Sequence, residues 1–526
     1  MTTDRIGIVG YGAYVPLQRI QSELIVRERE GKREDLPEFL EKVRNGLLLR
    51  DKSVAGISED SITIATEAAQ NALDMAGVGP DEIETVAVGS ESKPYAVGTI
   101  ARHVASFLGM GNRVYIADLE GACNSGMQST AFIESQILSG RIKYGLAVGT
   151  DVAQAPVGDP LEYACGAAAG AFLLGRDDRV ATIEDTAAYS SLTLDFWRRD
   201  GVHVPSHFGR TTVEAYIKHV IGAIEGMLMK HPEISLQDFD YITFHQPSGY
   251  MPMKTCKTLA QEKIPILDNP ELEERIRLTP EFIDERVRPW LRVLDTGNTY
   301  AASTLVATCD ILDHAKPGEN VLAVSYGSGA YTIATWLHVE DPILRKRGRT
   351  PTVRDYLNRR RDISLHSYRR LLRFKQHSLR SKLELPRIVA EVEPYNGKTL
   401  TYTLCNGCGR VFYPARGRCL EFDCKGPVEQ HTMPLNARIL SIDKPTMRER
   451  LVSNFELLKQ GKVLIVDATS SELSPGMELE LVIRRLDDEG KSGLIIYGPV
   501  YRPVFRTKAL LREAEARATA AKVLAS

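Results

Sequence analysis

One cysteine stands where the sequence could place a nucleophile. Cys123 follows the apolar run Val114–Ala117 and a Gly-Ala step, and it precedes the helix-forming stretch Gly126–Ser139. This order predicts a strand-to-helix turn with Cys123 at the helix N-terminus, where free N–H groups and the helix dipole favour the nucleophilic thiolate. A buried structural cysteine is the ordinary alternative.

Three other polar side chains also follow apolar runs that predict strands: Glu91, His245 and Asn298. A histidine beside a thiolate would stabilise it and later polarise a carbonyl group. A carboxylate in a partly dry pocket would remove a methyl proton from a thioester. Without further context, Glu91 could equally be a surface acid and His245 a structural histidine.

The elements that must position these groups occur twice. Strand-like and helical runs alternate over the first 340 residues, which predicts an α/β domain with helices flanking a sheet. The order of residues 79–88 recurs at 236–245, so we infer two copies of one unit, residues 1–175 and 176–340. Loops after equivalent strands would then meet at a pseudo-twofold axis.

Several fragments of this region together form a specific pattern. They are GSESKPYA at 89–96, GAC at 121–123, DFWRR at 195–199, FHQP at 244–247, GNTY at 297–300 and SYGSGA at 325–330. In this order they resemble the 3-hydroxy-3-methylglutaryl-CoA (HMG-CoA) synthases of archaea and bacteria. The resemblance covers residues 5–340 and implies a duplicated thiolase-like fold with α-β-α-β-α layers.

The same resemblance implies a reaction. Cys123 would take an acetyl group from acetyl-CoA, and Glu91 would then remove a methyl proton. The carbanion would attack acetoacetyl-CoA while His245 supports the alkoxide, and water would release HMG-CoA. Asn298 is shared with the third type of ketoacyl synthase. Biosynthetic thiolases carry a second cysteine in their C-terminal glycine motif, and residues 326–329 have none.

Two loops are expected to hold the substrate. Backbone N–H groups of Cys123 and of the loop with Gly327, Ser328 and Gly329 would form an oxyanion hole. The glycines could instead serve only a tight turn. The aromatic and basic loop with Arg198 and Arg199 would bind CoA phosphates or shape the acyl tunnel, and an ordinary surface loop is the alternative.

A basic linker, residues 341–395, follows the duplicated unit. Between positions 345 and 382, 14 Lys or Arg residues stand against two acidic ones. Apolar residues interleave with the charges and predict two short amphipathic helices. Such a segment could bind nucleic acid, but docking on acidic groups of a partner domain is the favoured interpretation.

Four cysteines then lie within 20 residues of one another. Cys405, Cys408, Cys419 and Cys424 form two pairs whose spacing predicts a structural Zn²⁺ site in a zinc ribbon, residues 396–430. The wider gap before Cys424 leaves its ligation open.

Short alternating strands after the cysteines predict a small β-barrel. The segments 437–442, 462–466, 477–484 and 492–499 suggest a five-stranded OB fold, residues 431–510, followed by a tail, residues 511–526. Helix, zinc ribbon and OB fold in this order resemble the DUF35 family, whose members accompany thiolase-superfamily enzymes. This resemblance implies a thiolase as a candidate partner. Few aromatic residues suit base stacking, which argues against nucleic acid.

Bulk composition limits the remaining possibilities. A chain of 526 residues is expected to form two to four domains, and its net charge of −2 shows no bias toward polyanions. There is no apolar run of about 18 residues, so no membrane span is predicted. The N-terminus lacks a signal-peptide pattern, so a cytoplasmic location is expected.

Three functional hypotheses follow. The leading one is the HMG-CoA synthase reaction, with acetyl-CoA and acetoacetyl-CoA as substrates and a homodimer implied by the resemblance. The second is a related condensing enzyme or C-acyltransferase with another acyl-CoA as acceptor. The third is a non-catalytic scaffold or a nucleic-acid-binding protein that uses the basic linker and the OB domain.

Overall fold

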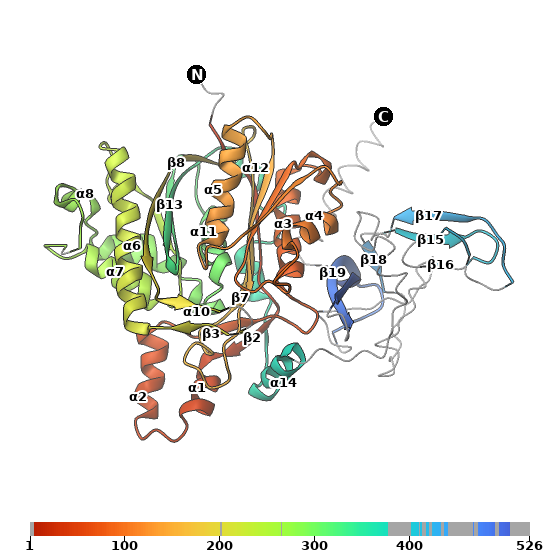
Figure 1. Cartoon of the computed structure of the whole chain (residues 1–526), viewed down its shortest axis with the longest axis horizontal. Coiled ribbons are helices and arrows are strands. Elements are labelled where there is room, and N and C mark those ends of the chain that lie inside the picture. The colour runs from red at the N-terminus through yellow and green to blue at the C-terminus, as the bar shows by residue number, and fades with distance from the viewer. Residues whose placement is uncertain are drawn as a thin grey trace. The chain divides into compact units, whose positions relative to one another are not determined.

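The computed structural model divides the chain into two units (Figure 1). One unit comprises residues 1–104 and 113–373, and the other residues 105–112 and 374–526. The described residues are 5–199, 202, 204–264, 266–376, 401–409, 411–412, 417–419, 423–432, 436–439, 467, 472–489 and 494–504.

A nine-stranded sheet runs through the first unit. From one edge to the other it contains β11 (Tyr241–Phe244), β12 (Asn320–Gly327), β13 (Gly329–Val339), β8 (Ala181–Thr193), β1 (Gly7–Tyr14), β7 (Ala167–Gly175), β6 (Gly145–Val152), β4 (Thr85–Gly89) and β5 (Tyr115–Leu119). Strands β4 and β6 are parallel and are followed by antiparallel β7 and β1. Strands β11 and β12 are parallel and are followed by antiparallel β13 and β8. The predicted duplication is therefore present in the strand pairing.

The halves differ at one point. In the first half, β5 pairs parallel with β4 and leads to Cys123. The corresponding apolar run in the second half was predicted to be a strand before Asn298, and this prediction is wrong. Val293–Thr296 forms the single-turn helix α10, which ends at Gly297 with φ +70°. An apolar run of this length suits either a strand or a buried helical turn.

Helices and sheet alternate in layers (Figure 1). Helix α3 (Ser61–Ala76) packs on β1, β7 and β6, and α6 (Gly209–Lys230) packs on β8, β13 and β12. Helix α11 (Ser303–Leu312) contacts strands of both halves as well as α5 (Ser125–Leu138), and it is buried along its whole length. Helices therefore pack on strands of both halves, and the expected α-β-α-β-α layering stays a prediction.

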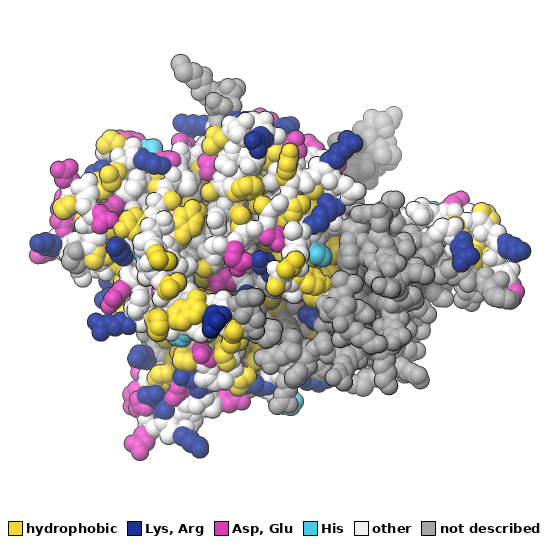
Figure 2. Space-filling view, in the orientation of Figure 1, with side chains coloured by type: hydrophobic (Ala, Val, Ile, Leu, Met, Phe, Trp, Pro, Cys, Tyr) yellow, Lys and Arg dark blue, Asp and Glu magenta, His cyan; other side chains and the backbone are white. Residues whose placement is uncertain are grey.

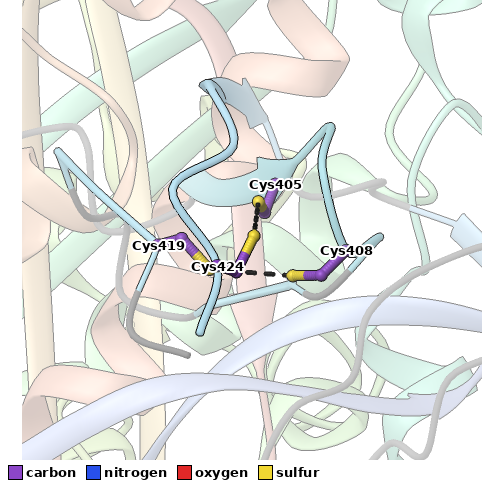
Figure 3. Close-up of side chains that lie close together, drawn as sticks. All are labelled: Cys405, Cys408, Cys419 and Cys424. Carbon is purple, nitrogen blue, oxygen red and sulfur yellow. Dashed lines mark hydrogen bonds between the residues drawn. The ribbon is translucent and has the colours of Figure 1, made fainter. Parts of the chain in front are cut away.

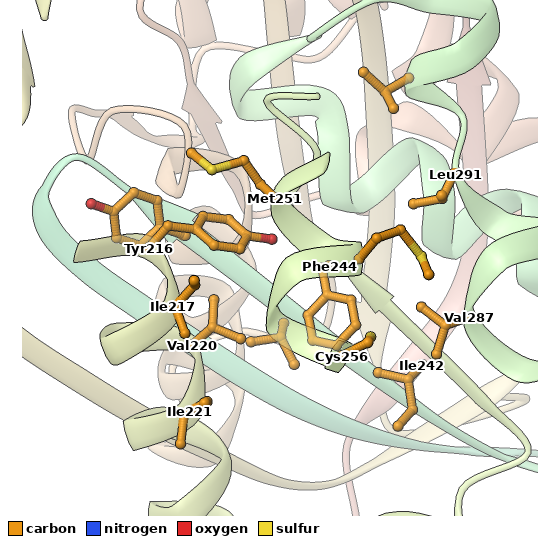
Figure 4. Close-up of a cluster of buried hydrophobic side chains, with 14 of the residues drawn as sticks. Tyr216, Ile217, Val220, Ile221, Ile242, Phe244, Met251, Cys256, Val287 and Leu291 are labelled. Carbon is orange, nitrogen blue, oxygen red and sulfur yellow. The ribbon is translucent and has the colours of Figure 1, made fainter. Parts of the chain in front are cut away.

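The core of the second half lies between α6, β11 and α7 (Tyr250–Leu259) (Figure 4). Its apolar face on α6 repeats at helical spacing and includes Tyr216, Val220 and Ile221, and Phe244 points into the same cluster from β11. This packing fixes the end of β11, the strand that leads to His245.

Shorter elements complete the first unit. They are β2 (Gln18–Gln21), α1 (Ser22–Glu30), α2 (Leu36–Glu41), β3 (Asp51–Val54), α4 (Ile100–Phe107), β9 (Phe196–Trp197), β10 (Ser206–His207), α8 (Glu273–Ile276) and α9 (Pro280–Phe282). On the visible face of this unit, basic, acidic and apolar side chains are interspersed (Figure 2). Within the described parts of the chain, no helix is long and apolar enough to cross a membrane.

The first part of the basic linker belongs to the first unit. It contains α12 (Ile343–Lys346), α13 (Val353–Asn358), β14 (Arg361–Asp362) and α14 (Leu365–Gln376). Its cations pair with acids of the α/β core: Lys346 with Asp178, Arg354 with Asp310, Arg360 with Asp51, and Arg369 with both Glu28 and Glu162. These ion pairs agree with the expected docking of the basic linker on acidic groups. Residues 377–395 lie outside the described part of the chain.

The second unit contains two small antiparallel sheets. The first orders β16 (Val411–Phe412), β15 (Thr401–Cys405) and β17 (Val428–Thr432), and the second orders β18 (Asn436–Arg438), β19 (Glu478–Glu489) and β20 (Leu494–Pro503). Strands β19 and β20 match two of the expected barrel strands. The segment 462–466 and the tail 511–526 fall outside the described residues, so the OB barrel stays a prediction.

Candidate active site

Cys123 lies in the turn between β5 and α5, as predicted. Asn124 is the N-cap of α5, and Cys123 itself is 7% exposed. The preceding residue, Ala122, has φ +49°, a left-handed conformation that non-glycine residues rarely adopt. Such backbone strain is typical of functional sites, because the surrounding structure must hold it in place. Here it turns the chain so that Cys123 enters the site.

Glu91 follows the parallel strand β4, so its loop reaches the same sheet edge as Cys123. Asp151, at the end of β6, holds this loop. One of its carboxylate oxygens accepts hydrogen bonds from the backbone N–H groups of Glu91 and Ser92, each at 2.9 Å. The other oxygen accepts from the N–H of Ala301 at 2.8 Å, next to the Asn298 loop. Asp151 therefore joins loops from both halves.

Glu91 and Cys123 lie in loops that follow the adjacent parallel strands β4 and β5, and each group shifts the pKa of the other. Burial, followed by the charge of Asp151, raises the pKa of Glu91 to about 8. Burial, followed by the charge of Glu91, raises the pKa of the Cys123 thiol well above its usual value. The thiolate expected from the helix N-terminus is thus disfavoured in the free site, because burial and acidic neighbours outweigh the helix dipole.

His245 directly follows β11 and is buried. Burial lowers the pKa of His245 to about 3, so the imidazole is neutral near pH 7. Its backbone carbonyl accepts a hydrogen bond from the Tyr216 hydroxyl at 2.6 Å, and its backbone N–H donates to the Val324 carbonyl at 2.7 Å. Among the described residues, its Nδ1 has no hydrogen-bond partner. A neutral imidazole can accept the thiol proton and later donate a hydrogen bond.

Asn298 follows α10 and is held by residues next to Cys165. Its N–H donates to the Ala164 carbonyl at 2.6 Å, and its own carbonyl accepts from Gly166 at 2.7 Å. The side-chain Oδ1 accepts from the N–H of Tyr300 at 2.8 Å. Asn298 therefore shapes the turn that carries Tyr300.

The glycine motif lies against the cysteine turn. A Cβ atom on Gly327 would stand 2.1 Å from the Gly121 carbonyl oxygen, so only glycine allows this approach. Asp195 anchors the motif from the other side. Its carboxylate accepts from the Tyr326 hydroxyl at 2.8 Å, from the Ser328 hydroxyl at 3.2 Å and from the Gly329 N–H at 3.2 Å.

The two arginines of the aromatic and basic loop have different surroundings. Arg198 donates to the backbone carbonyl of Glu91 at 3.1 Å, which brings its loop to the site. Arg199 is exposed to solvent.

Sequence reasoning missed Asp151, Asp195 and Tyr300. Asp151 lies at the carboxyl end of the apolar strand β6, and this position was an available signal. Asp195 and Tyr300 lie inside motifs that were recognised for other residues. Their roles depend on hydrogen bonds to groups that are distant in the sequence or on packing, and periodicity does not show these contacts.

Buried polar atoms without a hydrogen-bond partner gather in the same motifs. In the described part of the chain they include Glu91 Oε1, both side-chain polar atoms of Asn124, the Ser125 hydroxyl and the Ser325 hydroxyl. Native proteins rarely bury such groups without a reason, and substrate binding is a common one. The motifs around Cys123 thus offer unsatisfied donors and acceptors.

The four clustered cysteines of the second unit come together (Figure 3). Their sulfur atoms all lie within 4.8 Å of one another, with 3.5 Å between Cys405 and Cys424 and 3.6 Å between Cys408 and Cys419. Four thiolates at about 2.3 Å from one ion would be spaced in this way, so the donor set fits a tetrahedral metal such as Zn²⁺. Cys424 belongs to the cluster despite its wider spacing.

Comparison with known proteins connects this geometry to a family. Residues 54–170 match the family model of the thiolase N-terminal domain. A hydroxymethylglutaryl-CoA synthase of Methanopyrus kandleri is 40% identical over 370 residues, which cover 70% of this chain and 97% of that protein. The corresponding protein of Archaeoglobus fulgidus is 42% identical over 339 residues, 64% of this chain and 90% of its own length.

Solved structures give the same fold. The structure of MvaS in complex with 3-hydroxy-3-methylglutaryl coenzyme A superposes with a TM-score of 0.62 at 23% identity, and the match covers 70% of this chain and 91% of that chain. The relatives match the chain over about two thirds of its length. This chain belongs to the hydroxymethylglutaryl-CoA synthase family.

Proposed function

We propose that the chain condenses acetyl-CoA with acetoacetyl-CoA to give HMG-CoA through an acetyl-Cys123 intermediate. The observation that carries this proposal is the placement of Glu91 and Cys123 in loops after the adjacent parallel strands β4 and β5, where each group shifts the pKa of the other. A nucleophile alone would suit any acyltransferase. A partly buried carboxyl group with a raised pKa, near that nucleophile, suits removal of a proton from the carbon next to a thioester.

The first step is acetyl transfer. Neutral His245 accepts the Cys123 proton, the thiolate attacks the acetyl carbonyl, and CoA leaves with that proton as its thiol. One thioester replaces another, so the exchange is nearly balanced. Acetylation of Sγ brings the acetyl group to the sheet edge that also carries the Glu91 carboxyl group.

Condensation and release follow. Glu91, as the carboxylate, takes a methyl proton, and the resulting carbanion attacks the 3-carbonyl carbon of acetoacetyl-CoA. His245 donates a hydrogen bond to the alkoxide that forms, and the proton that Glu91 removed is returned to the alkoxide through His245 to give the 3-hydroxyl group. Water then hydrolyses the thioester to Cys123: its hydroxyl group completes the free carboxyl group of HMG-CoA, and its remaining proton returns to the Cys123 sulfur. No redox partner is needed, because the reaction only forms one carbon–carbon bond and cleaves thioesters.

Two loops complete the proposed site. Backbone N–H groups at Cys123 and at Gly327–Gly329 would stabilise the oxyanion of the acetyl carbonyl. The close approach of Gly327 to Gly121 supports this assignment. Arg198 and Arg199 would contact CoA phosphates near the entrance.

The second unit is proposed to be a DUF35-type module with a structural Zn²⁺ held by Cys405, Cys408, Cys419 and Cys424, and with an OB fold. The sulfur cluster supports the metal assignment. A module of this kind would bind CoA or dock a thiolase that supplies acetoacetyl-CoA.

We also propose a homodimer formed along β5. Among the described residues, this edge strand pairs on one side only, and Tyr115 on it is 73% exposed. Unpaired edges of this kind favour pairing with another chain. A cytoplasmic location is consistent with the thiols of all eight cysteines, which are free.

Intact mass and product analysis test the function. Incubation with acetyl-CoA alone should add one acetyl group to the wild type and none to Cys123→Ala. A chase with acetoacetyl-CoA should clear the acetyl group and yield HMG-CoA. Acetylation that acetoacetyl-CoA cannot clear would point to a different acceptor. Complete absence of acetylation would contradict the proposal.

A further inference from the structure

Tyr300 lies directly beside the nucleophile. Its side chain is buried in a small cluster with Cys123, Cys165 and Ala155, and the ring of Phe196 packs against it at a centroid distance of 6.2 Å.

The position of Tyr300 is fixed at three points. The Cys165 sulfur lies 3.1 Å from its hydroxyl oxygen, and its N–H is bound to Asn298 Oδ1. The next residue, Ala301, is bound to Asp151. Tyr300 also has φ +47°, a conformation that costs free energy and that these contacts hold in place. Such a rigid ring can act as a wall.

We propose that Tyr300 limits the acyl donor to two carbons. The inference rests on the proposed function. In acetyl-Cys123 the methyl carbon must face Glu91, because Glu91 removes its proton. A further carbon, as in a propionyl group, would point away from Glu91 and into the apolar cluster, where the Tyr300 ring lies. Donor selection is therefore steric, by a ring that the backbone contacts to Asn298 and Asp151 hold in place.

The test compares donors on one set of variants. The rate of Cys123 acylation is measured with acetyl-CoA and with propionyl-CoA, each alone, by intact mass and release of free CoA. Tyr300→Gly deletes the ring, and glycine accepts the positive φ without strain. Tyr300→Phe is the matched control, because it keeps the ring and removes only the hydroxyl.

Wild type and Tyr300→Phe should prefer acetyl-CoA by about 100-fold, the discrimination that one methylene group commonly gives. In Tyr300→Gly the preference should fall to about tenfold or less. A wild type that accepts propionyl-CoA equally well, or a folded Tyr300→Gly that keeps the full preference, would overturn the inference. HMG-CoA formation by the wild type is measured in the same experiment. If the wild type forms HMG-CoA but Tyr300→Gly keeps the full preference for acetyl-CoA, the inference about Tyr300 fails and the proposed function stands.

A second variant tests the proposal if Tyr300→Gly does not fold. Ala155→Val adds two methyl groups within the same cluster, which Ala155 shares with Cys123 and Tyr300. It should slow acylation by propionyl-CoA more than acylation by acetyl-CoA, so the preference rises above that of the wild type. An unchanged preference in this variant would also contradict the proposal.

Discussion

The two halves of the α/β unit share one strand pattern but, in the proposed mechanism, divide the chemistry between them. The first half supplies Glu91 and Cys123 from loops after β4 and β5. The second half supplies His245 after β11 and Asn298 after α10, where the helical turn replaces the strand seen in the first half. The covalent and proton-removing groups thus come from one half, and the supporting groups come from the other. Equivalent positions in the two halves therefore carry different functional groups in the proposed mechanism.

Loss of the nucleophile should have the largest effect. Cys123→Ala should abolish acetylation and lower the rate of HMG-CoA formation by at least about 10⁴-fold, because no other group can carry the acetyl intermediate. Cys165→Ala is a useful comparison, since Cys165 is buried in the same cluster but contacts Tyr300. By intact mass, Cys165→Ala should still gain an acetyl group, whereas Cys123→Ala should not. Acetylation of Cys123→Ala would contradict the assignment.

The Glu91→Gln variant should separate the two steps. Acetylation of Cys123 should persist, whereas condensation should fall by about 10³-fold, because glutamine cannot accept a proton. Single-turnover kinetics with preformed acetyl-enzyme measure the second step alone. Equal losses in both steps would show that Glu91 acts mainly on the nucleophile.

The pH dependence of condensation follows from the pKa of Glu91. The base is active as the carboxylate, and the pKa of Glu91 is raised to about 8 by burial and by Asp151. The rate of condensation should therefore rise with pH up to about 8 and fall about tenfold per unit well below it. The residual activity of Glu91→Gln should lack this dependence. A flat profile in the wild type would contradict the role of Glu91 as base.

Removal of the imidazole in the second half should cost less. His245→Asn should slow both acetylation and condensation by about 100-fold, because a proton acceptor and a hydrogen-bond donor are lost together. The rate of Cys123 acetylation by acetyl-CoA measures the first step, and single-turnover condensation of preformed acetyl-enzyme measures the second. A defect confined to one step would sharpen the division between the halves.

The smallest effect on chemistry is expected in the second unit. Cys408→Ser should lower bound zinc, measured by atomic emission, and destabilise the cysteine-containing module. Acetylation of Cys123 by acetyl-CoA should stay within about twofold of the wild type. His431→Gln is a control nearby, because His431 lies on β17 and outside the sulfur cluster. Full zinc content in Cys408→Ser would argue against the four-cysteine site.

Much of the site was visible in the sequence, for physical reasons. Local apolar patterns predict the strands before Glu91 and His245 and the helix after Cys123. The folded chain keeps these elements because their apolar faces pack in the core. The helical turn before Asn298 was missed because four apolar-rich residues do not distinguish a strand from a turn. The pKa of Cys123 was misjudged because its burial and the nearby charge of Glu91 arise only when distant segments meet. Asp151 and Asp195 act through the same kind of distant contact.

The central claim is that Glu91 removes a proton from acetyl-Cys123, and hydrogen exchange tests it most directly. Enzyme acetylated with trideuteroacetyl-CoA, without any acceptor, is followed by intact mass in ordinary water. The account predicts gradual loss of deuterium from the wild-type acetyl group and none from acetylated Glu91→Gln. Equal loss from both enzymes, with acetylation intact, would contradict the claim that Glu91 is the base.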